Sequence, residues 1–354
     1  MKNKGITILM INIICVKLFL TFPRTLVINS GSGAWLQMLL AAVLAYVIFC
    51  VSMRIYRICG LKDIIDVSRE SGGKILAGIV GIILFCVLGA NIGIMMRIFP
   101  ESIKMFLLPD IELEYIALIF LAASAFGAYM GLDALVNLMS IIVFPAAAIM
   151  IIFFISLFGE LDISNISPVL GNGIPAILKG WNALSIFSDI ILFNLFLSEF
   201  SDFREAEKAG RRAIAYSGAI GLAITVIYTL IYPYPISGEI LMPVYRLVRS
   251  VDVAGIFGRM ESVLAFVWCI LTFISSSAYV YEMAVVIKKS FSLENHKMLI
   301  IPSAVIISSV GLVDINIVDV LKNERILGAA VYICAVLLPV LAAVVYIIGG
   351  RKKT

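Results

Sequence analysis

The sequence has few charged residues and a single histidine, and this lack of polar chemistry limits what the protein can do. Charged residues make up 14% of the 354 positions and apolar residues 62%. In soluble domains about 25% of residues are charged and about 45–50% are apolar. No HExxH, CxxC, G-x-S-x-G or phosphate-binding glycine motif occurs. Because those motifs carry metal, nucleophilic and phosphate chemistry, the sequence predicts neither an enzyme nor a cofactor-binding protein.

Paired cysteines and a basic soluble surface are also missing. The six cysteines lie in or beside apolar segments without motif spacing, at Cys15, Cys50, Cys59, Cys86, Cys269 and Cys334. This placement favours small packing residues over disulfides or metal ligands. The net charge of +4 reflects charged connections between apolar segments, so no nucleic-acid partner is expected.

What the sequence has in abundance is long apolar segments, each of about the length needed to cross a bilayer. Ten predicted spans are Gly5–Leu26, Trp35–Met53, Ile75–Phe99, Tyr115–Met130, Leu135–Phe158, Asn182–Phe200, Ala213–Ile236, Val263–Ile287, Met298–Leu312 and Ile326–Ile348. The longest connection, residues 237–262, is about 26 residues long. Backbone in lipid must satisfy its own hydrogen bonds, and the segments lack strand-like alternation. The sequence therefore predicts an all-α polytopic protein in a lipid bilayer, with one integral membrane domain over 1–354.

The basic residues indicate the orientation of the spans. With the N-terminus inside, 17 of the 27 Lys and Arg fall in inner segments and 8 in outer ones, so the positive-inside rule predicts that both termini are cytoplasmic. Lys2 and Lys4 before an apolar stretch resemble a signal peptide. Lys17 interrupts that stretch and no A-x-A-like cleavage site follows, so we expect a retained first helix.

Three local strings share one resemblance. They are TFPR (Thr21–Arg24), NISPVLGNGIPAILKG (Asn165–Gly180) and FGRMESVLAFVW (Phe257–Trp268). Together with the ten spans they resemble the spore-germination permease family, the GerAB-like B subunits of nutrient germinant receptors. That family is a branch of the amino acid-polyamine-organocation transporter superfamily.

The resemblance implies a LeuT-like fold with two inverted five-helix repeats, residues 1–158 and 159–354, and with helices one and six broken near the midplane. A broken helix exposes backbone N–H and C=O groups that can hold a charged ligand. This chain departs from the family where Val16, Lys17 and Leu18 replace the glycines of helix one, and where residues 185–192 lack the glycine and glutamate of helix six. Because glycine tolerates unusual backbone angles, we expect unwinding to be harder here.

Lys17 and Asp189 are opposite charges near the middle of the first and sixth spans. Ionisable residues at this depth are costly and rarely face lipid. Three interpretations remain open: the two residues neutralise each other as a buried pair, the pair also contacts a ligand, or Lys17 extends toward an interface.

The candidate ligand site surrounds these two charges. The broken helices implied by the resemblance supply most of its residues, and Asn91 in the third span and Glu261 at the start of the eighth complete it. Asn91 could instead hold helices together beside small residues, and Glu261 could cap its helix. The candidate ligand-binding residues are Val16, Lys17, Leu18, Thr21, Asn91, Ser185, Ser188, Asp189 and Glu261.

The resemblance implies a membrane subunit that senses a small, amino acid-like nutrient and triggers germination. It would lie in the spore inner membrane, beside an A-type membrane subunit with a large soluble domain and a C-type lipoprotein. The alternative is a proton-coupled amino acid or amine transporter, in which Lys17 or Asp189 carries the proton. A third possibility is a scaffold that has lost its binding site with the missing glycines.

Overall fold

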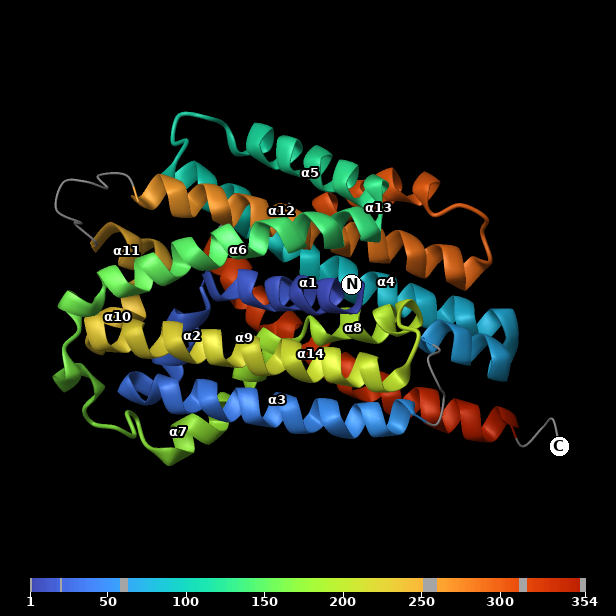
Figure 1. Ribbon diagram of the computed structural model, residues 1–354, viewed down its shortest axis with the longest axis horizontal. Helices are drawn as coiled ribbons and strands as arrows, with labels where there is room; N and C mark the ends of the chain where they lie inside the picture. Colours follow the sequence, from blue (N-terminus) through green and yellow to red (C-terminus); the bar gives the residue numbers. More distant parts are fainter. Residues whose placement is uncertain (1, 20, 58–62, 251–259, 312–316, 351–354) are drawn as a thin grey trace.

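The computed structural model is all-helical over the residues that it describes, 2–19, 21–57, 63–250, 260–311 and 317–350. Its α-helices are α1 (Lys2–Val16), α2 (Phe22–Ser30), α3 (Ala34–Tyr56), α4 (Ile64–Phe106), α5 (Leu113–Met130), α6 (Leu132–Ser156), α7 (Ile174–Lys179), α8 (Ile190–Leu195), α9 (Phe203–Ile231), α10 (Ile236–Glu239), α11 (Pro243–Ser250), α12 (Met260–Phe291), α13 (Lys297–Gly311) and α14 (Ile317–Gly350). The long helices lie side by side in one bundle, and the short helices α7, α10 and α11 lie at one end (Figure 1).

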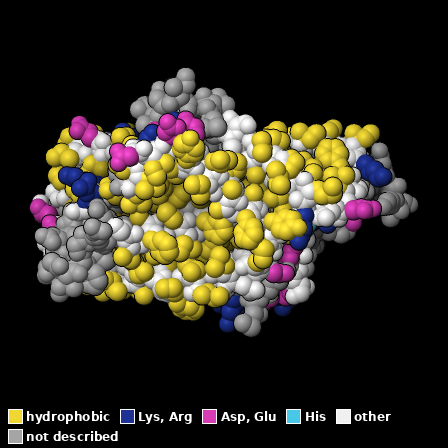
Figure 2. All heavy atoms as spheres, turned by 90° about the horizontal axis from the view of Figure 1, so that it is seen from above, with side chains coloured by type: hydrophobic (Ala, Val, Ile, Leu, Met, Phe, Trp, Pro, Cys, Tyr) yellow, Lys and Arg dark blue, Asp and Glu magenta, His cyan; other side chains and the backbone are white. Residues whose placement is uncertain are grey.

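Helix length and surface composition identify a multi-pass membrane protein. Six described segments are long and apolar enough to span a membrane: Phe22–Tyr56, Ile64–Met105, Leu113–Met130, Leu132–Glu160, Phe203–Ile231 and Ser262–Phe291. Asn3–Val16, Lys297–Ser309 and Ile326–Leu341 are shorter apolar helices. On the face in Figure 2, hydrophobic side chains fill the middle and charged side chains lie toward the two ends. An apolar band with polar ends is what a bilayer-embedded surface requires.

The two termini point the same way. Helix α1 runs from the N-terminus toward the end that carries α7, α10 and α11, and α14 runs back from that end toward the C-terminus (Figure 1). That both termini lie on the cytoplasmic side of the membrane stays a prediction from the charge distribution.

Helix α4 lies at the centre of the packing, against α12, α13 and α14. Asp63 caps its start by accepting hydrogen bonds from the backbone N–H of Ile65 at 2.9 Å and of Asp66 at 3.0 Å, which satisfies donors that a helix start otherwise leaves unpaired. At Gly73 the backbone has a φ of 73° and divides α4 into two helices. Glycine adopts such an angle without a steric penalty.

The sixth predicted span is not one continuous helix. Residues 180–199 contain three short helices. They are the 3₁₀ helix η5 (Gly180–Phe187), the six-residue α-helix α8 and the 3₁₀ helix η6 (Phe196–Glu199). Ser188 and Asp189 form the turn between η5 and α8. Because 3₁₀ hydrogen bonds fall between residues three apart, they satisfy the backbone in short pieces without glycine. The sixth span is therefore interrupted despite the missing glycine.

Candidate functional site

The first predicted span is interrupted where the sequence reasoning expected resistance to unwinding. Helix α1 ends at Val16, the 3₁₀ helix η1 covers Lys17–Phe19, and α2 starts at Phe22. Pro23 explains the restart, because it lies at the first turn of α2. In a continuous helix its ring would clash with the carbonyl of Phe19, to which it has no N–H to donate. The missing glycines therefore do not prevent an interruption of the first span, since Pro23 lies just after it.

The interruption brings Lys17 and Asp189 together. Lys17 Nζ lies 2.9 Å from Asp189 Oδ1, and the two side chains are 12% and 0% exposed. The predicted buried pair is confirmed, and extension of Lys17 toward an interface is excluded. Removing two charges from water costs several kcal/mol per ion, so such a pair is tolerable only when further hydrogen bonds hold it.

Three neutral side chains provide those hydrogen bonds. Lys17 Nζ donates to Asn91 Oδ1 and to Ser188 Oγ, each at 3.1 Å. Asn91 Nδ2 lies 3.0 Å from Asp189 Oδ1 and 2.6 Å from the Tyr279 hydroxyl, and that hydroxyl also donates to Asp189 Oδ1. The interrupted first and sixth spans, α4 and α12 are thus joined by one buried polar network. Asp189 Oδ2 is buried and accepts no hydrogen bond from the described residues.

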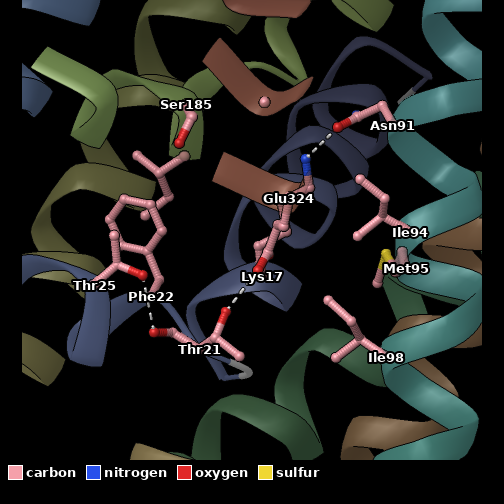
Figure 3. A pocket seen from close by; sticks show the side chains of 12 residues that line it. Lys17, Thr21, Phe22, Thr25, Asn91, Ile94, Met95, Ile98, Ser185 and Glu324 are labelled. Carbon is pink, nitrogen blue, oxygen red and sulfur yellow. Dashed lines mark hydrogen bonds between the residues drawn. The ribbon is translucent and has the colours of Figure 1, made fainter. Parts of the chain in front are cut away.

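A small cavity lies beside the ion pair. Its volume is about 30 Å³, which is room for one or two water molecules. Figure 3 shows the residues that line it, with Lys17 and Glu324 in the middle of the view, between Phe22, Thr25 and Ser185 on one side and α4 on the other. The lining residues are Lys17, Thr21, Phe22, Thr25, Asn91, Ile94, Met95, Ile98, Ser185, Ile186, Glu324 and Gly328. At one end of the cavity the Thr21 hydroxyl lies 2.9 Å from Glu324 Oε2.

The candidate residues chosen from sequence fall into three groups. Lys17, Thr21, Asn91 and Ser185 line the cavity, and Ser188 and Asp189 belong to the polar network behind it. Val16 and Leu18 are 1% and 0% exposed and pack in the apolar core. Glu261 lies in the first turn of α12, and its side chain lies outside the described part of the structure.

Sequence reasoning missed Tyr279, Glu324 and Gly328. Tyr279 is an aromatic residue in an apolar helix, which usually signifies packing, and its hydroxyl reaches Asp189 from α12. Glu324 and Gly328 lie on α14, where Glu324 precedes the apolar stretch of the tenth predicted span. An ionisable residue one turn from an apolar segment was the available signal for Glu324. No sequence pattern indicated that α14 would reach the first helix.

Fold and site together define a polytopic helical membrane protein whose interrupted helices enclose a buried ion pair and a small polar cavity. The chain belongs to the spore germination protein family, which it matches over residues 1–314. It is therefore a membrane protein of the spore germination permease family, to which germinant-receptor B subunits belong.

Three relatives from Bacillus subtilis (strain 168) support this membership. The chain is 26% identical to spore germination protein A2 over 294 residues, which is 80% of this chain and 78% of the relative. It is 28% identical to spore germination protein YndE over 282 residues, 75% of this chain and 74% of that relative. It is 21% identical to spore germination protein KB over 282 residues, which is 77% of this chain and 74% of that relative. The similarity covers most of each protein.

Proposed function

We propose that this chain is the nutrient-sensing membrane subunit of a germinant receptor and that the cavity beside Lys17 is its ligand site. The observation that carries the proposal is the pair of opposite charges in the cavity wall, the Lys17 ammonium and the Glu324 carboxylate. An amino acid-like nutrient carries a carboxylate and an ammonium of its own. Charge-assisted hydrogen bonds to such groups are about twice as strong as neutral ones, so this wall suits a zwitterion.

The cavity volume supports sensing by a conformational change. Room for one or two water molecules is too little for an amino acid, so the nutrient must bind a more open arrangement of the same walls. A ligand that binds the open arrangement better than the closed one shifts the equilibrium between them. The interrupted first and sixth spans are the elements that line both the cavity and the ion pair, and we propose that they move.

The proposed architecture is a LeuT-like pair of inverted repeats, residues 1–158 and 159–354, with the interruptions at Lys17–Phe19 and at Ser188–Asp189 as its two broken helices. The proposed location is the spore inner membrane with both termini in the cytoplasm. Over the described residues the chain consists of membrane helices and short connections. A signal therefore needs partners, which we propose are an A-type membrane subunit and a C-type lipoprotein.

The test compares Glu324→Gln with a matched variant in spores. Glu239 on α10 is an exposed glutamate outside the cavity, so Glu239→Gln makes the same chemical change away from the proposed site. We expect Glu324→Gln to weaken the response to at least one nutrient at least tenfold at normal subunit abundance. Nutrient-independent germination should stay intact in both variants. A normal nutrient response in Glu324→Gln spores would show that the cavity is not the ligand site.

A proton-coupled transporter is the second candidate, and the buried Lys17–Asp189 pair is the observation that favours it. Such pairs occur in proton relays within membranes. Counterflow in proteoliposomes separates the two functions, since a transporter exchanges labelled amino acid across the membrane and a sensor does not. Ligand-dependent protection against heat without counterflow would support the sensor.

A further inference from the structure

A second buried carboxylate lies one helical turn beyond the central network. Glu282 follows Tyr279 on the same face of α12, because residues three apart in a helix are neighbours. Its side chain is 3% exposed, and no described residue forms a hydrogen bond with it. Tyr279 bonds to the central ion pair, so Glu282 is the next carboxyl group on α12 toward the predicted cytoplasmic end.

Glu282 faces a cluster of charges, here called the inner cluster, formed by Asp63, Asp66, Glu199 and Lys289. The Lys289 ammonium bonds to Asp63 Oδ2, lies 3.5 Å from Asp66 Oδ2 and donates to Ser198 Oγ at 3.2 Å. Lys289 attracts the Glu282 carboxylate, whereas Glu199 and Asp63 repel it.

Two further charged groups act on α12 near the inner cluster. Arg69 of α4 bonds to Ser292 Oγ at 2.6 Å and to the Lys289 carbonyl, so its guanidinium is directed to the end of α12. Asp133 at the start of α6 acts on the neighbouring Tyr281, as do Glu199 and Glu282. The Lys289 ammonium is already bonded to two carboxylates, those of Asp63 and Asp66.

The energetics favour a neutral Glu282. An ionised carboxylate buried without hydrogen bonds costs several kcal/mol, and such a group takes up a proton instead. Lys289 does not remove this cost, because its contacts are made to Asp63 and Asp66. We propose that Glu282 is a proton-binding site, occupied in this conformation and emptied when α12 separates from α4 and η6.

The proton transfer is a simple acid dissociation. When the helices separate and water reaches Glu282, its O–H bond breaks, the proton passes to water at the predicted cytoplasmic end, and the electron pair stays on the carboxylate. The reverse step restores the neutral acid. Any movement of α12 away from Asp63, Asp66 and Glu199 is thereby linked to release of one proton, independently of which ligand binds the central cavity.

Infrared spectroscopy of the purified full-length protein in detergent tests the site directly. A protonated carboxylic acid has a C=O stretching band distinct from that of a carboxylate, and this band shifts in D₂O. We expect such a band at neutral pH in the unmodified protein and its loss in Glu282→Gln. The matched variant is Glu294→Gln, since Glu294 is exposed in the connection after α12 and should leave the band unchanged.

Protein stability gives a second readout. Gln mimics a neutral glutamic acid, so the unfolding temperature of Glu282→Gln should match that of the unmodified protein. An absent band at neutral pH, or a band that persists in Glu282→Gln, would overturn the proposal. A band that appears only after sodium and potassium are removed and disappears when either is restored would overturn it too, because Glu282 would then hold a metal cation.

Discussion

The Lys17–Asp189 pair offers the sharpest test of how the interrupted helices hold together. Replacing Lys17 with Met removes the ammonium and keeps most of the side-chain volume. Asp189 then stays 0% exposed with only neutral donors, Asn91 Nδ2 and the Tyr279 hydroxyl. The converse change, Asp189→Asn, leaves the Lys17 ammonium with two hydrogen-bond acceptors, Asn91 Oδ1 and Ser188 Oγ, each at 3.1 Å. Lys17 also lines the cavity.

These differences set the expected magnitudes. Breaking a buried pair by removing one partner costs about 3–5 kcal/mol. Two neutral hydrogen bonds still reach Asp189, so we expect about 3 kcal/mol for Lys17→Met, a change of roughly 100-fold in the folding equilibrium. Because Lys17 is 12% exposed and keeps two acceptors, Asp189→Asn should cost about 1–2 kcal/mol. The double variant has no unpaired charge and should be more stable than Lys17→Met alone.

The measurement is unfolding of each purified variant in detergent, followed by tryptophan fluorescence and by the yield of monodisperse protein. Lys179→Met is the matched control, because Lys179 is an exposed lysine at the end of α7, and it should change stability little. Independent sites add to within about 0.3–0.5 kcal/mol. If the double variant loses the sum of the two single losses, the two charges do not stabilise each other and the reasoning is refuted.

Three further predictions address the surrounding structure. Tyr279→Phe should lower stability by about 1–3 kcal/mol in the same unfolding assay, because it removes a donor from buried Asp189; no loss would exclude Tyr279 from the network. Gly171→Ala should destabilise the protein by more than about 1 kcal/mol, since φ is 54° and a Cβ there would collide with the Ser30 carbonyl. Gly159→Ala, with open space around it, is its control, and equal losses would contradict the argument. Glu261→Gln should alter the nutrient response of spores more than subunit abundance; a normal response would leave Glu261 as a helix cap.

The parts of the site that the sequence predicted are charged residues inside apolar segments, where the cost of burying a charge limits what each residue can do. Two opposite charges within two apolar segments must avoid lipid. Together with the resemblance, which implies breaks in both spans, this predicted that Lys17 and Asp189 meet across 171 intervening positions. The six segments that are long and apolar enough to span a membrane overlap predicted spans two to five, seven and eight, because long apolar runs have few other solutions in a bilayer.

The parts that the sequence did not predict depend on tertiary contacts or on alternative ways to break a helix. The loss of glycine was expected to make unwinding harder, whereas Pro23 and 3₁₀ geometry interrupt the first and sixth spans without it. Tyr279 and Glu324 reach the site from helices far along the chain, and nothing in their local sequence distinguishes a hydroxyl or carboxylate aimed at the cavity from one aimed elsewhere.

Helices α4 and α12 connect the central network with the inner cluster. Helix α4 carries Asn91 in the network and begins at the Asp63 cap, which bonds to Lys289. Helix α12 carries Tyr279 and Lys289, with Glu282 between them. The two helices pack along their length, so a shift of α12 that breaks the bond from Tyr279 to the ion pair also changes the surroundings of Glu282. Opening of the nutrient cavity and release of the proton would then be two consequences of one helix movement.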